Sequence, residues 1–139
     1  MGVDCFLDTS ILVYAVSSAE ADAARSRKAL ALVQRTDFGL SAQVLQEFYV
    51  TVTRKIRKPL SPELAVAFLD EYRVFPVVPT DYPLIVSAVE LSLRYGISYW
   101  DGAIVAAAEA LEASTLYTED LAHGRRYGKV RAVNPFLET

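Results

Sequence analysis

Carboxylates supply most of the side chains in this sequence that could do chemistry. The chain has one cysteine, Cys5, and one histidine, His123, so it lacks the material for a site built from several thiolates or imidazoles. The usual Ser/His/Asp and Cys/His nucleophile systems are equally short of partners. Catalysis would therefore depend on acidic side chains. Four of them stand at positions that favour a shared site, namely Asp8, Glu47, Asp101 and Asp120.

A cluster of carboxylates is suited to hard divalent cations. Mg²⁺ and Mn²⁺ prefer oxygen ligands, and Mg²⁺ usually keeps several waters in its coordination shell. Two full negative charges about 4 Å apart cost on the order of 4 kcal/mol at an effective dielectric of about 20, so an unneutralised cluster would take up protons or loosen. A bound metal ion removes this conflict, and we therefore expect Mg²⁺ or Mn²⁺ at the site.

The pattern of apolar residues predicts strands that alternate with helices. Short apolar runs predict strands over residues 3–7, 38–41, 74–78, 115–117 and 130–133. Helical spacing and capping residues predict helices over residues 11–16, 19–35, 42–56, 63–72, 84–95 and 99–112. Parallel neighbours need crossover connections, which helices supply, so this alternation predicts an α/β fold with a mainly parallel sheet between layers of helices. The length suits one domain over residues 1–139.

Such a fold would bring distant acids together. Ligands of an open parallel sheet gather at the carboxyl ends of its strands. Asp8 directly follows the first predicted strand, and Asp120 lies just beyond the strand that ends near Thr118. Asp101 falls in the first turn of its helix, on a face that carries apolar residues over the following two turns. Glu47 lies at the edge of an apolar helix stripe, where it can contribute to the site or be an ordinary solvated residue.

The other three acids also have purely structural interpretations. Asp8 can cap the first helix, and Asp101 completes a capping box with Ser98. Asp120 can be a turn residue, in which case Glu119 would be the functional acid. No single position decides between these interpretations.

Five segments together resemble the PIN-domain ribonucleases. They are Phe6-Leu7-Asp8-Thr9-Ser10, Glu47 in its helix, Tyr99-Trp100-Asp101-Gly102-Ala103-Ile104, Thr118-Glu119-Asp120-Leu121 and Val133-Asn134-Pro135-Phe136. Their order and spacing cover nearly the whole chain and look most like the VapC-type toxins of bacterial and archaeal toxin–antitoxin pairs. Within the last acidic segment we favour Asp120 over Glu119, because Asp120 occupies the final position of the family's T-x-D pattern.

The resemblance implies a three-layer α/β/α sandwich and a metal-dependent endoribonuclease. Its acidic quartet would hold one or two Mg²⁺ or Mn²⁺ ions, with Thr9 or Ser10 and Thr118 in support. The quartet would be Asp8, Glu47, Asp101 and Asp120. Hydrolysis would use water activated by the metal and would leave 5′ phosphate and 3′ hydroxyl ends. The likeness also implies a homodimer, neutralised by a cognate antitoxin that inserts a segment near the active site.

Two basic clusters are candidates for contact with the RNA backbone. The first is Arg54, Lys55, Arg57 and Lys58, and the second is Arg125, Arg126, Lys129 and Arg131. Basic residues at a helix end also favour its dipole, and surface clusters often serve only solvation. Tyr99 and Trp100 can stack on bases, although we favour their packing in the core beside Asp101. The formal net charge of −3 becomes +1 without the four candidate acids, so it neither supports nor excludes an RNA partner.

Three other functions compete with this interpretation. A haloacid-dehalogenase-like phosphatase needs Asp-x-Asp, whereas this chain has Asp8-Thr9-Ser10. A response-regulator-like receiver pairs two acids at its first strand, and Asp8 has no such neighbour. A PIN-like module that only binds RNA or protein would have lost catalytic acids, but all four are present. Attack by the RNA's own 2′-OH would need a histidine pair, which His123 alone cannot supply.

The sequence also favours a location in the cytoplasm. No apolar stretch approaches the roughly 20 residues of a membrane-spanning helix, and the start of the chain lacks the basic region and cleavage site of a signal peptide. We therefore expect a cytoplasmic protein without a membrane partner.

Overall fold

A six-stranded, mainly parallel sheet forms the centre of the fold. The computed structural model describes residues 2–137. Its strands are β1 (Cys5–Leu7), β2 (Phe38–Ser41), β3 (Val77–Val78), β4 (Thr115–Tyr117), β5 (Arg126–Tyr127) and β6 (Val130–Val133). Its helices are α1 (Thr9–Val16), α2 (Ala23–Val33), α3 (Ala42–Arg54), α4 (Pro62–Tyr72), α5 (Tyr82–Tyr95) and α6 (Tyr99–Ala110), with a 3₁₀ turn, η1 (Glu20–Asp22), before α2.

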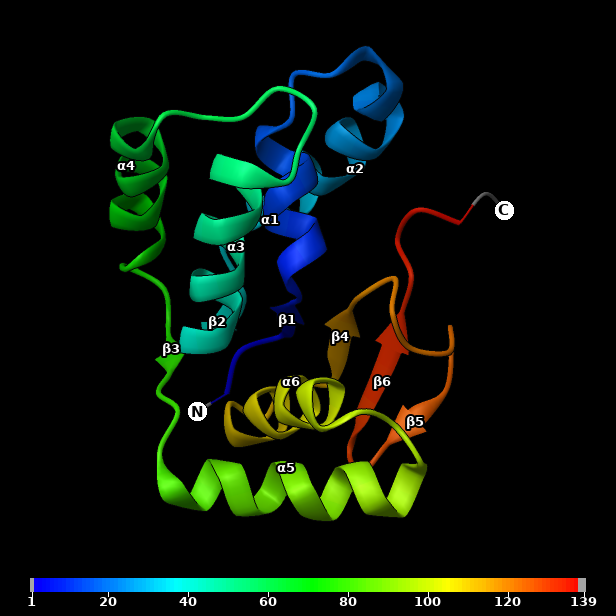
Figure 1. Cartoon of the computed structure of the whole chain (residues 1–139). Helices are drawn as coiled ribbons and strands as arrows, with labels where there is room; N and C mark the ends of the chain where they lie inside the picture. The colour runs from blue at the N-terminus through cyan, green and yellow to red at the C-terminus, as the bar shows by residue number, and fades with distance from the viewer. Residues whose placement is uncertain (1, 138–139) are drawn as a thin grey trace.

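The order of strands across the sheet is β3-β2-β1-β4-β6-β5. All neighbouring strands are parallel except β5, which pairs with β6 in the antiparallel sense. Figure 1 shows α5 and α6 together at one side of the molecule and α1 to α4 gathered at the other. The predicted α/β fold with a mainly parallel sheet flanked by helices is confirmed.

The central strands are short apolar runs because helices cover the sheet. Every residue of β1 and β2 is buried, as expected for parallel strands that face a core on both sides. Phe6, Phe38 and Leu116 have no accessible surface. Because the apolar residues of these strands must stay covered, the register of the sheet fixes where each strand ends and therefore where the residue after it lies.

Side-chain caps set the points at which most of the helices begin. The side-chain oxygens of Ser41, Ser61, Asp81 and Ser98 each accept the backbone N–H three residues later. Gly96 ends α5 in the left-handed conformation with φ of 65°, which glycine adopts without a steric penalty. These signals are local, and they explain why the predicted helices are found close to their expected limits.

Close contact between α5 and α6 depends on a glycine. A Cβ atom at Gly102 would lie 2.6 Å from the carbonyl oxygen of Ala88 on α5. Any larger residue at position 102 would therefore push the two helices apart. Gly102 directly follows Asp101, so this contact also determines how the first turn of α6 is placed.

Several predicted boundaries were wrong, and one strand was missed. The strand predicted over 3–7 begins only at Cys5, the one over 74–78 is limited to β3, and the helix predicted over 19–35 starts as η1. The missed strand β5 joins β6 through a tight turn at Gly128, whose φ is 62°. Two residues are too few to show a strand pattern in the sequence. The predicted domain over 1–139 also includes residues 1 and 138–139, which lie outside the described residues.

No helix in the described part of the chain is both long enough and apolar enough to cross a membrane.

Candidate active site

Asp8 lies at the carboxyl end of β1, where its side chain is held by two donors. Thr118 Oγ1 donates to Asp8 Oδ2 at 2.7 Å, and the backbone N–H of Thr9 donates to Asp8 Oδ1 at 2.7 Å. The Asp8 residue is only 5% exposed. Asp8 can therefore cap α1 and belong to the site at the same time. One of its carboxylate oxygens binds Thr9, the first residue of α1, and the other binds Thr118, which is distant in the sequence.

Burial raises the pKa of Asp8 to about 7. The hydrogen bonds from Thr118 and Thr9 act in the opposite direction, and the negative charges of Asp120 and Glu47 raise the pKa further. At neutral pH the carboxylate is thus held in surroundings that disfavour its charge. A cation at this position would favour the ionised form.

Thr118 links Asp8 to Asp120. Thr118 follows β4, is fully buried, and its Oγ1 accepts the backbone N–H of Asp120 at 3.1 Å. Adjacent to it, Glu119 accepts a hydrogen bond of 3.4 Å from the Tyr14 hydroxyl. The geometry therefore groups Asp120 with Asp8, whereas Glu119 is grouped with α1.

Glu47 reaches the site from the middle of α3. Its Oε1 accepts a hydrogen bond of 2.7 Å from Thr9 Oγ1, so Thr9 contacts two of the predicted acids, Asp8 through its backbone and Glu47 through its hydroxyl. The Glu47 residue is exposed. Its charge can therefore face a ligand in the open part of the site.

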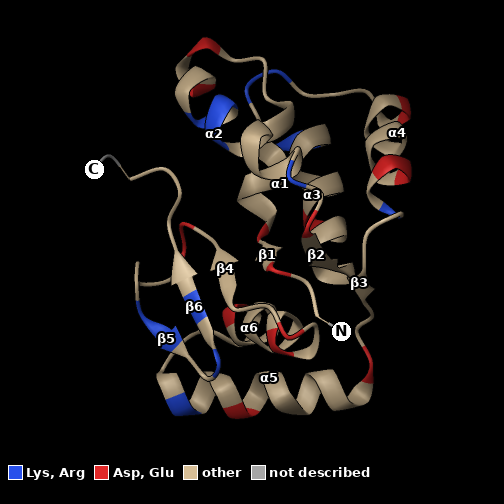
Figure 2. Cartoon of the chain, turned by 180° about the vertical axis from the view of Figure 1, so that it is seen from behind, with Lys and Arg blue, Asp and Glu red and all other residues tan. Residues whose placement is uncertain are grey.

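Asp101 lies half-buried in the first turn of α6, where the Ser98 hydroxyl accepts its backbone N–H at 3.0 Å. Partial burial raises the pKa of the Asp101 carboxyl group, interaction of this group with the Ser98 side chain lowers it, and the charges of Asp120 and Glu47 raise it again. Asp101 is thus close enough to Asp120 and Glu47 for their negative charges to raise its pKa. Figure 2 shows acidic positions where β1 leads into α1 and in the loop after β4, so distant segments meet at one edge of the sheet.

The acids do not form a ready-made metal cage. Within residues 2–137, no three side chains of His, Cys, Asp or Glu lie close enough together to be a metal-binding group by themselves. The donor set nevertheless suits a hard cation, because every candidate is an oxygen donor and Mg²⁺ typically uses one or two carboxylates together with waters and substrate phosphate. Among the described residues, the buried Ser10 hydroxyl has no hydrogen-bond partner, as expected of a polar group that binds a ligand or water.

Two grooves adjoin the acids. One, of about 420 Å³, includes Thr9, Ser10 and Asp120 in its lining, and the other, of about 350 Å³, includes Thr9 and Glu47. Thr9 and Thr51 line both, so the grooves meet at these two residues. Glu47 and Asp120 therefore face two adjoining grooves, whereas Asp8 and Asp101 line neither of them.

The structure separates the predicted RNA contacts into two groups. Lys55 lines the groove at Glu47, and Arg57 lines the groove at Asp120. Arg54 and Lys58 are exposed but line neither groove.

The predicted contacts of the second cluster lie in or beside the β5–β6 hairpin. The guanidinium of Arg125 lies 5.4 Å from the ring centre of Tyr95 and 4.9 Å from that of Tyr127, so it packs against this hairpin. Arg126 is exposed in β5, opposite Arg131. Lys129 is exposed in the turn between the strands.

One expectation beside Asp101 was wrong. Trp100 does not pack in the core, since 63% of the residue is exposed; Tyr99 is half-buried against it, with the two ring planes at 82°. The first turn of α6 directs position 100 outward while the residues from Gly102 onward face the core. His123 accepts the backbone N–H of Asn134 through Nδ1 at 3.0 Å, which gives the only histidine a structural role.

The fold and the acidic residues define an α/β protein whose candidate site lies at the carboxyl edge of parallel strands. The sequence pattern that describes the PIN domain family matches residues 5–129, and the chain therefore belongs to this family. No curated protein matches the chain.

Solved structures of toxin–antitoxin proteins share the fold. Mycobacterium tuberculosis VapC20, a sarcin-ricin loop cleaving toxin, is 22% identical over 84% of this chain and 89% of its own, with a TM-score of 0.67. The structure of FitAB bound to an IR36 DNA fragment is 21% identical over 97% of this chain and 98% of its own, with a TM-score of 0.68. A toxin–antitoxin complex from Klebsiella pneumoniae is 18% identical over 95% of this chain and 98% of its own, with a TM-score of 0.69.

Proposed function

We propose that this protein is a divalent-metal-dependent endoribonuclease and the toxin of a toxin–antitoxin pair. The observation that carries the proposal is the set of hydrogen bonds through two threonines, which ties Asp8 to Asp120 by way of Thr118 and Glu47 to the same strand end by way of Thr9. Membership of the PIN family, with VapC-type toxins among the proteins of the same fold, supports it.

The four acids share one role in the proposed reaction. Asp8, Glu47, Asp101 and Asp120 would hold the cation. When bound, Mg²⁺ or Mn²⁺ would activate water and stabilise the leaving 3′ oxygen, which yields 5′ phosphate and 3′ hydroxyl ends. Thr118 and Thr9 fix the two oxygens of Asp8, so this carboxylate is oriented before substrate arrives.

The basic residues of the grooves would position the RNA. Lys55 lines one groove and Arg57 lines the other, and their charges offset the repulsion between the acids and the phosphates of the substrate. Lys55 directly follows the end of α3 and Arg57 lies three residues beyond that end, so their placement depends on the same helix that carries Glu47. We therefore expect them to affect binding of RNA more than the chemical step.

Cleavage of structured RNA by matched pairs of variants tests the proposal. Asp8→Asn and Glu47→Gln should each abolish cleavage that occurs with Mg²⁺ or Mn²⁺ and stops in EDTA. Asp4→Asn, an exposed acid before β1, and Glu63→Gln, an exposed acid on α4, remove the same charges elsewhere and should retain activity. Equal activity of Asp8→Asn and Asp4→Asn would show that the site is misplaced. RNA binding without metal-dependent cleavage by any form would instead indicate a catalytically inactive binding module.

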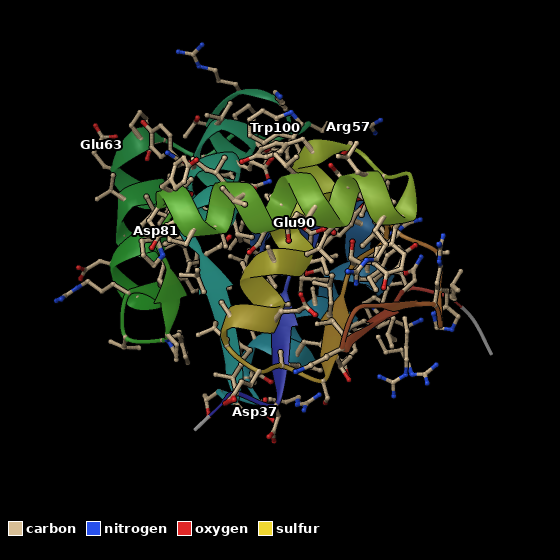
Figure 3. All side chains as sticks on the ribbon, turned by 90° about the horizontal axis from the view of Figure 1, so that it is seen from below. Asp37, Arg57, Glu63, Asp81, Glu90 and Trp100 are labelled. Atoms are coloured by element: carbon tan, nitrogen blue, oxygen red, sulfur yellow. The ribbon has the colours of Figure 1, made fainter. Side chains whose placement is uncertain are left out.

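The outer face of α5 supports a homodimer as part of the proposal. Tyr82, Ile85, Val86, Val89 and Leu93 are exposed and form one stripe, whereas Leu84, Ala88 and Leu91 on the other side of α5 are buried. Figure 3 shows α5 as the outermost element on this side, in front of α6. A helix that is apolar on both faces is typical of a buried helix. Antiparallel pairing with a second copy would place Tyr82 opposite Leu93 and Val86 opposite Val89.

An apolar groove between α3 and α4 is the surface we propose for the antitoxin. It has a volume of about 560 Å³ and is lined by Leu45, Gln46, Tyr49, Val50 and Leu69. Gln46 and Val50 also line the groove at Glu47. A segment bound along α3 would therefore extend directly to the acids. Val50→Asp should weaken capture of a co-expressed cognate antitoxin, whereas Val74→Asp, at another exposed apolar residue, should not.

A further inference from the structure

The groove at Asp120 differs in chemistry from a phosphate-binding site. Three carboxylates line it, those of Asp22, Glu119 and Asp120, against one basic residue, Arg57. Carboxylates in such a lining repel a phosphate group but accept hydrogen bonds from neutral N–H groups. Its volume of about 420 Å³ lies within the usual range of small-ligand pockets, so the groove can take a nucleobase.

The walls of the groove are suited to the flat faces of a base. Val13, Tyr14 and Ile56 contribute apolar surface. The Tyr14 ring is held in place by an edge-to-face contact with Phe136, at 5.0 Å between ring centres, and by the Arg25 guanidinium 5.6 Å from its centre. Unstacked bases of single-stranded RNA are commonly bound by such walls and then recognised at their polar edges.

Glu119 is the carboxylate in the groove best placed to recognise a base. Its Oε1 accepts only the long, 3.4 Å hydrogen bond from Tyr14, and Oε2 accepts none within the described residues. Asp22 is occupied differently, because its Oδ2 accepts a 2.7 Å hydrogen bond from the Ser17 hydroxyl. Asp120 belongs to the reaction site. Glu119 therefore retains the capacity to accept two hydrogen bonds side by side.

We propose that this groove binds a guanine base next to the scissile phosphate and that the Glu119 carboxylate accepts its N1–H and N2–H groups. Guanine alone among the four bases of RNA presents two adjacent donors on its Watson–Crick edge. Adenine and cytosine each present one donor beside an acceptor, and uracil presents one donor between two acceptors. The inference rests on the proposed function only in placing the base beside a bond that is cut.

Binding of short RNA in EDTA tests the inference without cleavage. The probes are fluorescently labelled heptauridylates with guanosine, inosine or adenosine at the centre, and the readout is fluorescence anisotropy. A bidentate contact typically discriminates by about 1–3 kcal/mol, which corresponds to about 5- to 150-fold. We expect guanosine to bind most tightly, inosine, which lacks the N2 amine, to be weaker, and adenosine to be weakest.

Variants identify the residue that recognises the base. Glu119→Gln should bring the affinities for the guanosine and adenosine probes close together, and Tyr14→Phe should reduce the difference in part. Glu20→Gln is the matched control, because Glu20 is exposed on η1 and does not line the groove. Loss of the preference in Asp22→Asn, with Glu119→Gln unchanged, would overturn the assignment to Glu119.

Mapping of cleavage sites with Mn²⁺ separates this inference from the proposed function. Cleavage beside guanosine, lost as a preference in Glu119→Gln, supports both. Cleavage together with equal binding of the three probes would overturn the guanine pocket while leaving the nuclease intact. Preferential binding of guanosine without metal-dependent cleavage would contradict the proposed function and leave the pocket standing.

Discussion

Replacing Asp8 with asparagine should make the metal-free protein more stable at alkaline pH. Burial raises the pKa of Asp8 from its ordinary value of 3.8 to about 7, so the folded state binds this proton more tightly than the unfolded chain does. The contribution of Asp8 to the free energy of unfolding is therefore greatest below about pH 4 and is lost as the pH rises through about 7. A difference of about three pKa units corresponds to about 4 kcal/mol in total, and more than half of this falls between pH 5 and pH 8.

Urea denaturation in EDTA measures this effect. The free energy of unfolding of wild type should fall between pH 5 and pH 8 by roughly 3 kcal/mol more than that of Asp8→Asn. Asp4→Asn serves as the control, because Asp4 flanks the other end of β1 and is exposed. Its pH dependence should follow wild type.

Metal provides a second arm of the same experiment. At pH 8, Mn²⁺ should raise the free energy of unfolding of wild type, because a ligand that binds only the folded state stabilises it. The increase should be much smaller for Asp8→Asn. A pH dependence identical in wild type and Asp8→Asn would refute the account of a buried, destabilised carboxylate.

Three further changes test other parts of the account. Thr118→Val keeps the side-chain shape but removes the donor to Asp8, and it should weaken Mn²⁺ binding, measured by calorimetry, about 10- to 100-fold; unchanged affinity would contradict a supporting role. Gly102→Ala should lower stability in urea by about 1–3 kcal/mol, because its Cβ meets Ala88, and an unchanged midpoint would contradict the close α5–α6 contact. Val89→Glu should give monomers by light scattering after size exclusion while Leu64→Glu, on α4, should not; a dimer in both would exclude α5 as the interface.

Most of the sheet was predictable from the sequence because its central strands are short runs of mostly apolar residues. Residues 38–41 and 115–117 were predicted with the limits that β2 and β4 have. Such runs carry their signal locally, and alternation with helices then implies parallel pairing. The hairpin strand β5 carried no such signal, because its pairing with β6 depends on a turn at Gly128 and not on an apolar run of its own.

The acidic positions were visible in the sequence, but their partners were not. The Thr9–Glu47 hydrogen bond spans 38 positions and the Thr118–Asp8 bond spans 110, so both depend on how α3 and β4 pack beside β1. The role of Tyr14 was missed for the same reason, since it is defined by contact with Glu119 across the site. Exposure of Trp100 could not be predicted either, because an aromatic residue beside a buried helix face has no periodic signal of its own.

The most direct test of the central claim is the chemistry of the RNA ends after cleavage by wild-type protein in Mg²⁺ or Mn²⁺. Hydrolysis at a carboxylate-held metal predicts 5′ phosphate and 3′ hydroxyl ends, and no products in EDTA. Products with 2′,3′-cyclic phosphate and 5′ hydroxyl ends, formed equally in EDTA, would contradict it, because they require attack by the RNA's own 2′-OH.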